Sequence, residues 1–188
     1  HRLAAAGFNN HLELVSPMAG RRGVLRILDA LVRWQPELSK ASDSIDSGGN
    51  LLKAIDSLRR VLRPGSQILL LLDPRSVSEA MILALARLRG HNDVAVMLLV
   101  DPIEQAPPPP ASYRISNGNV QGILHLESRE TRQRWQQHFA HMHSELTLRL
   151  RRVGAKVSTV TTDADPVQAL AELLRGASTE LHEFKEAK

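Results

Sequence analysis

The sequence of 188 residues predicts an α/β fold, with a mostly parallel open sheet, helices on both faces and a small antiparallel hairpin insertion. Two apolar segments, 67–72 and 94–100, are strand-sized and lack polar alternation, which is typical of parallel strands buried on both faces. Helical patterns alternate with these strands, and this alternation favours parallel pairing. The length suits one core, so we predict a single domain over 1–176 followed by a charged tail over 177–188.

The other elements follow from local patterns of apolar residues and from turn signals. Ser76 and Glu79 form a capping-box pattern that predicts a helix beginning at Val77. Asn117-Gly118 is a strong two-residue hairpin signal, and the proline run 107–110 predicts an extended surface segment rather than a docking motif. The remaining predicted elements are strands over 11–15, 113–115, 120–126 and 156–161, and helices over 21–34, 51–62, 77–88, 129–153 and 166–174.

Composition excludes several classes of function. The chain has no cysteine, which rules out disulfides, thiolate metal sites and cysteine nucleophiles. The net charge is +4, but basic and acidic residues are interspersed and only 3% of residues are aromatic, so we predict no nucleic-acid partner. No apolar run approaches the roughly 20 residues that cross a bilayer. The chain begins at His1 without a leader pattern, and we expect further residues before it.

Four segments of the chain carry a resemblance to a known family: Gly48-Gly49-Asn50-Leu51-Leu52, Ile68-Leu69-Leu70-Leu71-Leu72-Asp73, Val100-Asp101-Pro102 and Gly154-Ala155-Lys156-Val157. Their order and spacing resemble those of a von Willebrand factor type A domain, a Rossmann-like fold. More narrowly, the chain resembles the uncharacterised bacterial subgroup associated with MoxR-type ATPases. The resemblance covers nearly the whole chain, and it depends on order and spacing rather than on a single motif.

The resemblance implies a magnesium site at the carboxyl edge of the sheet, made in the family by an Asp-x-Ser-x-Ser strand, a threonine and an aspartate. The threonine position is Asn50 here and the aspartate position is Asp73, whereas the Asp-x-Ser-x-Ser strand is absent. We therefore expect an incomplete, degenerate metal site in this chain, with no cofactor and no tight magnesium binding. We expect magnesium to bind only in a complete parent protein. The alternatives are that Asn50 is a helix N-cap and that Asp73 is a turn residue before Pro74. Asp101 is a weaker ligand candidate.

The missing motif strand normally lies in the middle of the sheet, between the strands predicted at 11–15 and 67–72. Loss of a central strand would expose unpaired backbone groups on both neighbours. We therefore expect either direct pairing of these two strands or a homo-oligomer that borrows a strand from another copy.

Two charged clusters lie on the long helix. Of His138, His141 and His143, only the first two share a helix face, so a solvated polar face is favoured over a metal site. A group of arginines could attract an acidic partner or anionic lipid, but a charged outer face is the more ordinary interpretation. These are Arg129, Arg132, Arg134, Arg149, Arg151 and Arg152.

The resemblance implies a non-enzymatic protein–protein interaction or adaptor module that works with a MoxR-like AAA+ ATPase in assembly or maturation of complexes. We expect a cytoplasmic location, either for the protein alone or as the cytoplasmic part of a membrane-anchored parent, with no membrane contact by this chain. None of the common nucleophile, phosphate-loop or zinc-protease motifs is present. The alternative is a small α/β hydrolase or phosphate-binding enzyme that uses Asp73 as an acid or base.

Overall fold

The computed structural model describes the chain in two compact units. The first unit comprises His1–Leu62 and Arg114–Gly122, and the second comprises Arg63–Tyr113 and Ile123–Lys188. A single domain over 1–176 stays a prediction. The described residues are 2–8, 12–35, 52–53, 55–58, 62–116 and 121–175.

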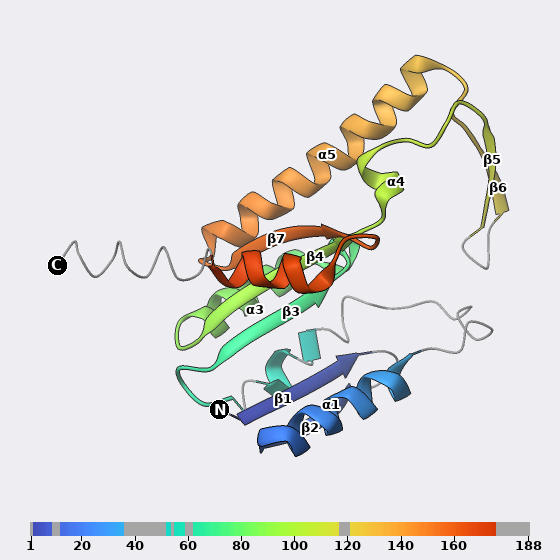
Figure 1. The fold of residues 1–188 in the computed structure, drawn as a ribbon. Helices are drawn as coiled ribbons and strands as arrows, with labels where there is room; N and C mark the ends of the chain where they lie inside the picture. The colour runs from blue at the N-terminus through green and yellow to red at the C-terminus, as the bar shows by residue number, and fades with distance from the viewer. Residues whose placement is uncertain are drawn as a thin grey trace. The chain divides into compact units, whose positions relative to one another are not determined.

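The second unit is built on a parallel sheet, as the sequence predicts. Its three strands are β3 (Gln67–Leu72), β4 (Asp93–Val100) and β7 (Lys156–Thr161), in the order β3-β4-β7 (Figure 1). Ile68 pairs with Val94 on one side of the middle strand, and Val157 pairs with Val96 on the other. The apolar, β-branched sequence of β4 suits this central position, where both neighbours cover its backbone.

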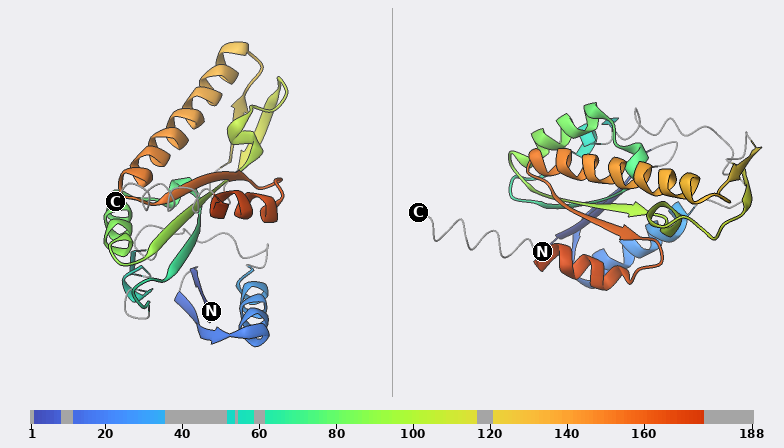
Figure 2. Two further views of the ribbon diagram at one scale, coloured as in Figure 1. Left: turned by 60° about the vertical axis from the view of Figure 1, so that its left-hand side comes forward. Right: turned by 90° about the horizontal axis from the view of Figure 1, so that it is seen from above.

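Helices cover both faces of this sheet, which confirms the predicted layers. The helices α3 (Glu79–Arg89) and α5 (Arg129–Arg152) lie on one face, and the helix over 166–175 lies on the other (Figure 2). Leu146 and Leu150 are the buried residues of α5. On the opposite face, Met97 and Val160 pack with Leu173 in a small apolar cluster.

Strand β3 departs from the prediction that it is buried on both faces. Ile68 and Leu72 are buried, but Leu69 and Leu71 are 42% and 57% exposed. These two leucines share the face of the sheet that the helix over 166–175 covers, and that helix packs on β4 and β7. An apolar run cannot distinguish a strand covered on both faces from one covered mainly on one.

The start of α3 also differs from the prediction. Ser78, not Ser76, caps the helix, and its Oγ accepts a hydrogen bond of 3.3 Å from Met81 N. The residues Pro74–Ser76 form a separate 3-10 turn, η2, and the Ser76 hydroxyl donates instead to the Asp73 carbonyl at 2.7 Å. Proline fixes the chain direction at this turn, so the helix begins after it.

The described residues of the first unit include an antiparallel pair of strands, the helix that follows it, and further helical residues at 52–53 and 55–58. β1 (Arg2–Phe8) pairs with β2 (Leu12–Ala19), and α1 (Gly20–Trp34) follows directly. The Trp34 ring packs against Gly7, where an added Cβ would lie 2.5 Å from Cδ2, and Trp34 Nε1 donates to Glu13 Oε2 at 2.7 Å. The sequence analysis found a strand at 11–15 but missed β1, because three alanines and a glycine give this strand weak β-propensity.

β2 pairs with β1, and β3 pairs with β4. Direct pairing of the predicted strands 11–15 and 67–72 stays a prediction. Strand exchange with another copy stays a prediction.

The expected hairpin insertion is present. α4 (Pro102–Gln105) leads through the proline segment to β5 (Ser112–Ser116), which pairs with β6 (Gln121–His125) in a separate two-stranded sheet. The Tyr113 hydroxyl donates to the Pro109 carbonyl at 2.6 Å and so ties the proline segment to the hairpin. The turn residues Asn117-Gly118 lie outside the described residues. Among the described residues, none of the helices combines the length and apolar character that a membrane span requires.

Candidate binding site at the carboxyl edge of the sheet

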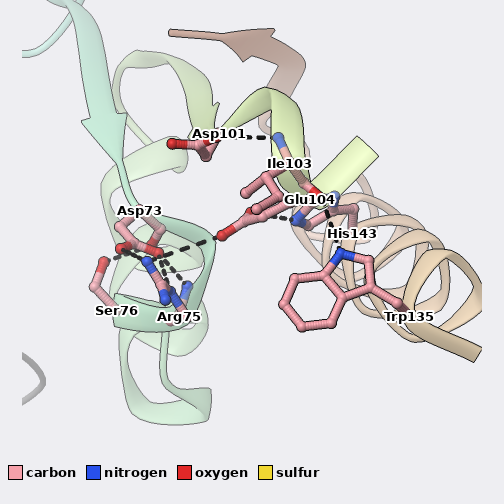
Figure 3. Close-up of polar contacts among 8 residues, drawn as sticks. All are labelled: Asp73, Arg75, Ser76, Asp101, Ile103, Glu104, Trp135 and His143. Atoms are coloured by element: carbon pink, nitrogen blue, oxygen red, sulfur yellow. Dashed lines mark hydrogen bonds and ion pairs between the residues drawn. The ribbon is translucent and has the colours of Figure 1, made fainter. Parts of the chain in front are cut away.

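Two aspartates follow neighbouring parallel strands, as the sequence predicts, and each caps the short helical turn after it. Asp73 follows β3, and its Oδ1 accepts from Arg75 N at 2.8 Å. Asp101 follows β4, and its Oδ1 accepts from Ile103 N at 3.0 Å (Figure 3). A proline follows each aspartate, because its fixed φ suits the first helical position. Both carboxylates thus have a structural role at the edge, in line with the turn interpretation of Asp73.

Asp73 also forms a two-point ion pair with the side chain of Arg75. Arg75 Nε lies 3.2 Å from Oδ1, and Nη2 lies 3.0 Å from Oδ2. Partial burial would raise the pKa of Asp73, but the hydrogen bonds from Arg75 and its positive charge lower that pKa below its ordinary value. Asp73 is therefore a carboxylate at neutral pH. Its side chain is 49% exposed and that of Arg75 is 66% exposed, so this pair of charges faces solvent.

Behind this pair lies a buried carboxylate, Glu104, which is only 7% exposed. Its Oε1 lies 3.9 Å from Arg75 Nη2, and its Oε2 lies 3.2 Å from Nε2 of His143 on α5 (Figure 3). The latter contact has ion-pair distance without hydrogen-bond geometry, and Nε2 makes no hydrogen bond to other described residues. We call Asp73, Arg75, Glu104 and His143 the carboxyl-edge network. It joins the ends of β3 and β4 to α5.

A second contact holds α4 against α5. Trp135 Nε1 donates to the Ile103 carbonyl at 2.8 Å (Figure 3). The centroid of the Trp135 ring lies 5.0 Å from that of Phe139. His143 continues this row, with its ring 6.0 Å from Phe139. Both Ile103 and Glu104 of α4 therefore contact α5. Because α5 is itself packed on the sheet, it supports the polar residues at the carboxyl edge.

Sequence reasoning was right that His143 points away from His138 and His141, but it missed the partner of His143. The His143 side chain is 12% exposed, whereas that of His141 is 81% exposed beside Glu145. A usable signal was present: His143 is four residues after Phe139 and three before Leu146, which places it in the apolar stripe. Glu104, one turn after the end of β4, had no comparable signal.

The magnesium expectation concerns Asn50 and Asp73. Asn50 lies outside the described residues, so its ligand and N-cap interpretations both stay predictions. Both carboxylate oxygens of Asp73 accept hydrogen bonds from the Arg75 guanidinium, which a cation would have to displace. Within the described ranges, no three histidine or acidic side chains are grouped as metal ligands. The described residues at this edge therefore do not fit a magnesium centre.

Several of the arginines on α5 have local partners. Arg134 pairs with Glu130 one turn away, and Arg149 pairs with Glu79 on α3. Arg151 Nη2 donates to the Val157 carbonyl at 3.5 Å. These contacts favour the interpretation of a charged outer face over that of an anion-binding patch.

The lowered pKa of Asp73 predicts a small acid-sensitive contribution to stability. Because the pKa is lower in the folded chain, the contribution is present above the ordinary value of 3.8 and is lost as pH falls through the folded pKa. Asp73→Asn should cost less than about 1 kcal/mol of unfolding free energy at pH 7, since the pair is half exposed. The difference from the wild type should shrink at pH 3, as measured by urea unfolding at both pH values. A difference that grows on acidification would contradict this assignment.

The fold and this edge define a protein of the α/β class with a parallel sheet and a charged, solvent-facing carboxyl edge. A family described as "Protein of unknown function DUF58" matches residues 1–145, and the chain belongs to this family. No curated protein and no solved structure matches the chain. The family description specifies no activity, so function has to be argued from the site.

Proposed function

We propose that this protein is a non-enzymatic protein–protein interaction module whose binding face is the carboxyl edge of the sheet around Asp73 and Arg75. The supporting observation is the carboxyl-edge network. It presents an exposed pair of opposite charges that is backed by the buried Glu104. A fixed pattern of charges on a rigid support suits recognition, because electrostatic complementarity selects a partner and its orientation.

The chemistry at this edge argues against the hydrolase alternative. A general acid needs a pKa near the working pH, and the pKa of Asp73 is lowered instead. The Ser76 hydroxyl donates to the Asp73 main-chain carbonyl, which is not a base. Asp73 therefore supplies charge and hydrogen-bond acceptors to a binding face, with its proton already lost.

A hydroxyl does meet an imidazole and a carboxylate elsewhere, where Ser112 contacts His125 and Glu127. In this cluster Ser112 Oγ lies 2.8 Å from His125 Nδ1, and Glu127 Oε1 lies 3.3 Å from the same nitrogen. A catalytic triad needs the hydroxyl and the carboxylate on opposite ring nitrogens, so that the histidine can relay a proton. All three side chains are exposed, and this arrangement suits a surface hydrogen-bond cluster.

The partner we propose is a MoxR-like AAA+ ATPase, in assembly or maturation of protein complexes in the cytoplasm. This proposal draws on the resemblance of the chain to the bacterial subgroup of von Willebrand type A domains, together with the charged edge. We propose further that the chain has a von Willebrand type A fold with a degenerate metal site. On this proposal, only a complete parent protein would bind magnesium.

The test replaces Asp73 with asparagine in the natural protein. We expect affinity for the ATPase to fall about tenfold, equivalent to about 1.4 kcal/mol, and esterase and phosphatase assays to stay at background. Asp101→Asn is the matched control, since Asp101 caps the neighbouring turn in the same way, and it should change the affinity by less than about twofold. Turnover that Asp73→Asn abolishes, or equal losses of affinity in both variants, would refute the proposal.

A further inference from the structure

Among the residues that the structure describes, no further strand pairs with the outer side of β7, so the sheet of the second unit is open at this edge. β7 is the last strand of the sheet and pairs with β4 through residues Lys156–Thr161. The other side of an edge strand presents main-chain N–H and C=O groups without ladder partners. Such groups are a template on which an extended chain can add as a further strand.

Three contacts establish which β7 residues face outward. Thr162 N donates to the Val100 carbonyl at 3.0 Å, so the even-numbered main-chain groups of this stretch point toward β4. The Val157 carbonyl accepts from Arg151 Nη2, and the Thr161 carbonyl accepts from Ala164 N at 3.0 Å. Neither of these partners is on β4. The main-chain groups of Val157, Thr159 and Thr161 therefore face the open edge.

These same contacts limit the open part of the edge. Arg151 occupies the carbonyl at one end, and the turn after β7 occupies the carbonyl at the other. Between them, the N–H and C=O of Thr159 have no outward partner among the described residues, and the N–H groups of Val157 and Thr161 flank them. A short extended segment opposite Thr159 can engage all of these groups.

A groove runs along this edge. Its volume is about 850 Å³, and it is lined by all of β7 together with part of the helix over 166–175. Ala169 and Leu173 give that helix wall an apolar strip, with Gln168 and Glu172 as polar neighbours. Small or β-branched side chains of an added strand would fit beside this strip, while its backbone pairs with Thr159.

We propose that the open edge of β7 binds an extended segment of a partner protein, which adds to the sheet as a short strand opposite Thr159. This inference deepens the proposed binding function and rests on it for its biological role. A second copy of the chain is a poorer occupant. In a two-fold β7–β7 pair, the N–H groups of Val157 and Thr161 would need carbonyls that are already occupied by Arg151 and Ala164.

The probe for the test is the blocked pentapeptide Thr-Val-Thr-Val-Thr, titrated into the ¹⁵N-labelled natural protein and followed by NMR. We expect the largest amide shifts at Val157, Thr159 and Thr161, with slowed exchange of the Thr159 amide. The same peptide N-methylated on alternate residues lacks the donors on one edge. It should bind at least about tenfold more weakly.

Thr159→Pro removes the central donor without removing a bond to β4, since proline is tolerated where the N–H of an edge strand faces outward. It should weaken peptide binding at least about tenfold, and the matched Thr159→Val should bind within about twofold of the wild type. Equal binding of the N-methylated peptide, or full binding by Thr159→Pro, would overturn the proposal. The peptide comparison needs no variant, so it decides the question even if Thr159→Pro fails to fold.

Two further readouts separate this inference from its alternatives. Concentration-dependent dimers that Thr159→Pro dissociates in sedimentation would assign the edge to a second copy and overturn the proposal. Asp73→Asn should leave peptide binding unchanged, because the carboxyl-edge network does not include β7. Peptide binding with no ATPase association would refute the proposed partner alone, whereas ATPase association without peptide binding would refute the β7 inference alone.

Discussion

Replacing Leu98 with alanine is expected to destabilise the protein by about 3–5 kcal/mol, the largest effect of any substitution considered for this chain. Leu98 is 0% exposed in the middle strand of the sheet, with a strand on each side of it. Truncation removes apolar surface from the core and leaves a cavity that two flanking strands and the covering helices cannot easily close. Urea unfolding, with the midpoint and slope compared to the wild type, measures the loss.

Leu99 supplies the matched control, because it is the next residue on the same strand and points to the opposite face. Its side chain is 38% exposed, so Leu99→Ala should cost only about 1 kcal/mol or less. Similar costs for the two substitutions would show that the face holding Leu98 is not the better-packed one, and would contradict the described layers.

Replacing Glu104 with alanine should cost about 2–3 kcal/mol of unfolding free energy. The carboxylate is buried between Arg75 and His143, and its removal leaves the nearly buried imidazole without its acidic partner. The cost should fall below the 3–5 kcal/mol typical of a broken buried pair, because Arg75 still forms its ion pair with Asp73 and remains in contact with solvent. Glu104→Gln keeps the shape and should cost about 1–2 kcal/mol.

Glu145→Ala is the control for Glu104, since Glu145 also faces a histidine of α5 but is 58% exposed. It should change stability by less than about 0.5 kcal/mol. Urea unfolding of all three variants at pH 7 should show the largest loss of unfolding free energy for Glu104→Ala, a smaller loss for Glu104→Gln and the smallest for Glu145→Ala. A Glu104→Ala variant as stable as the wild type would mean that the carboxyl-edge network does not support the edge.

The elements that sequence predicts well are those whose pattern is set by one apolar face or by a strong turn signal. α5 has leucines and aromatic residues at helical spacing, and β4 is apolar throughout, so both were predicted within a residue or two. β1 was missed because its Ala-Ala-Ala run has no strand pattern and depends on pairing with β2. The boundary of α3 was shifted because Ser76 and Ser78 are both suitable caps, and the turn at Pro74 decides between them.

The candidate site was predictable only in part. Carboxyl ends of parallel strands meet at one edge, which is why Asp73 and Asp101 were found. Arg75 and Glu104 were not predicted as site residues, because their roles depend on the distance between η2 and α4. No local sequence pattern encodes that distance. The partner of His143 lies 39 positions earlier in the chain, a separation that single-sequence reasoning cannot bridge.

The most direct test of the binding face is amide hydrogen exchange of the natural protein, measured with and without the MoxR-like ATPase. We predict that the ATPase slows exchange in the segments 73–76 and 101–105, which contain Asp73, Arg75 and Glu104 of the carboxyl-edge network. Unchanged exchange in both segments, with protection confined to other parts of the chain, would contradict a binding face at the carboxyl edge.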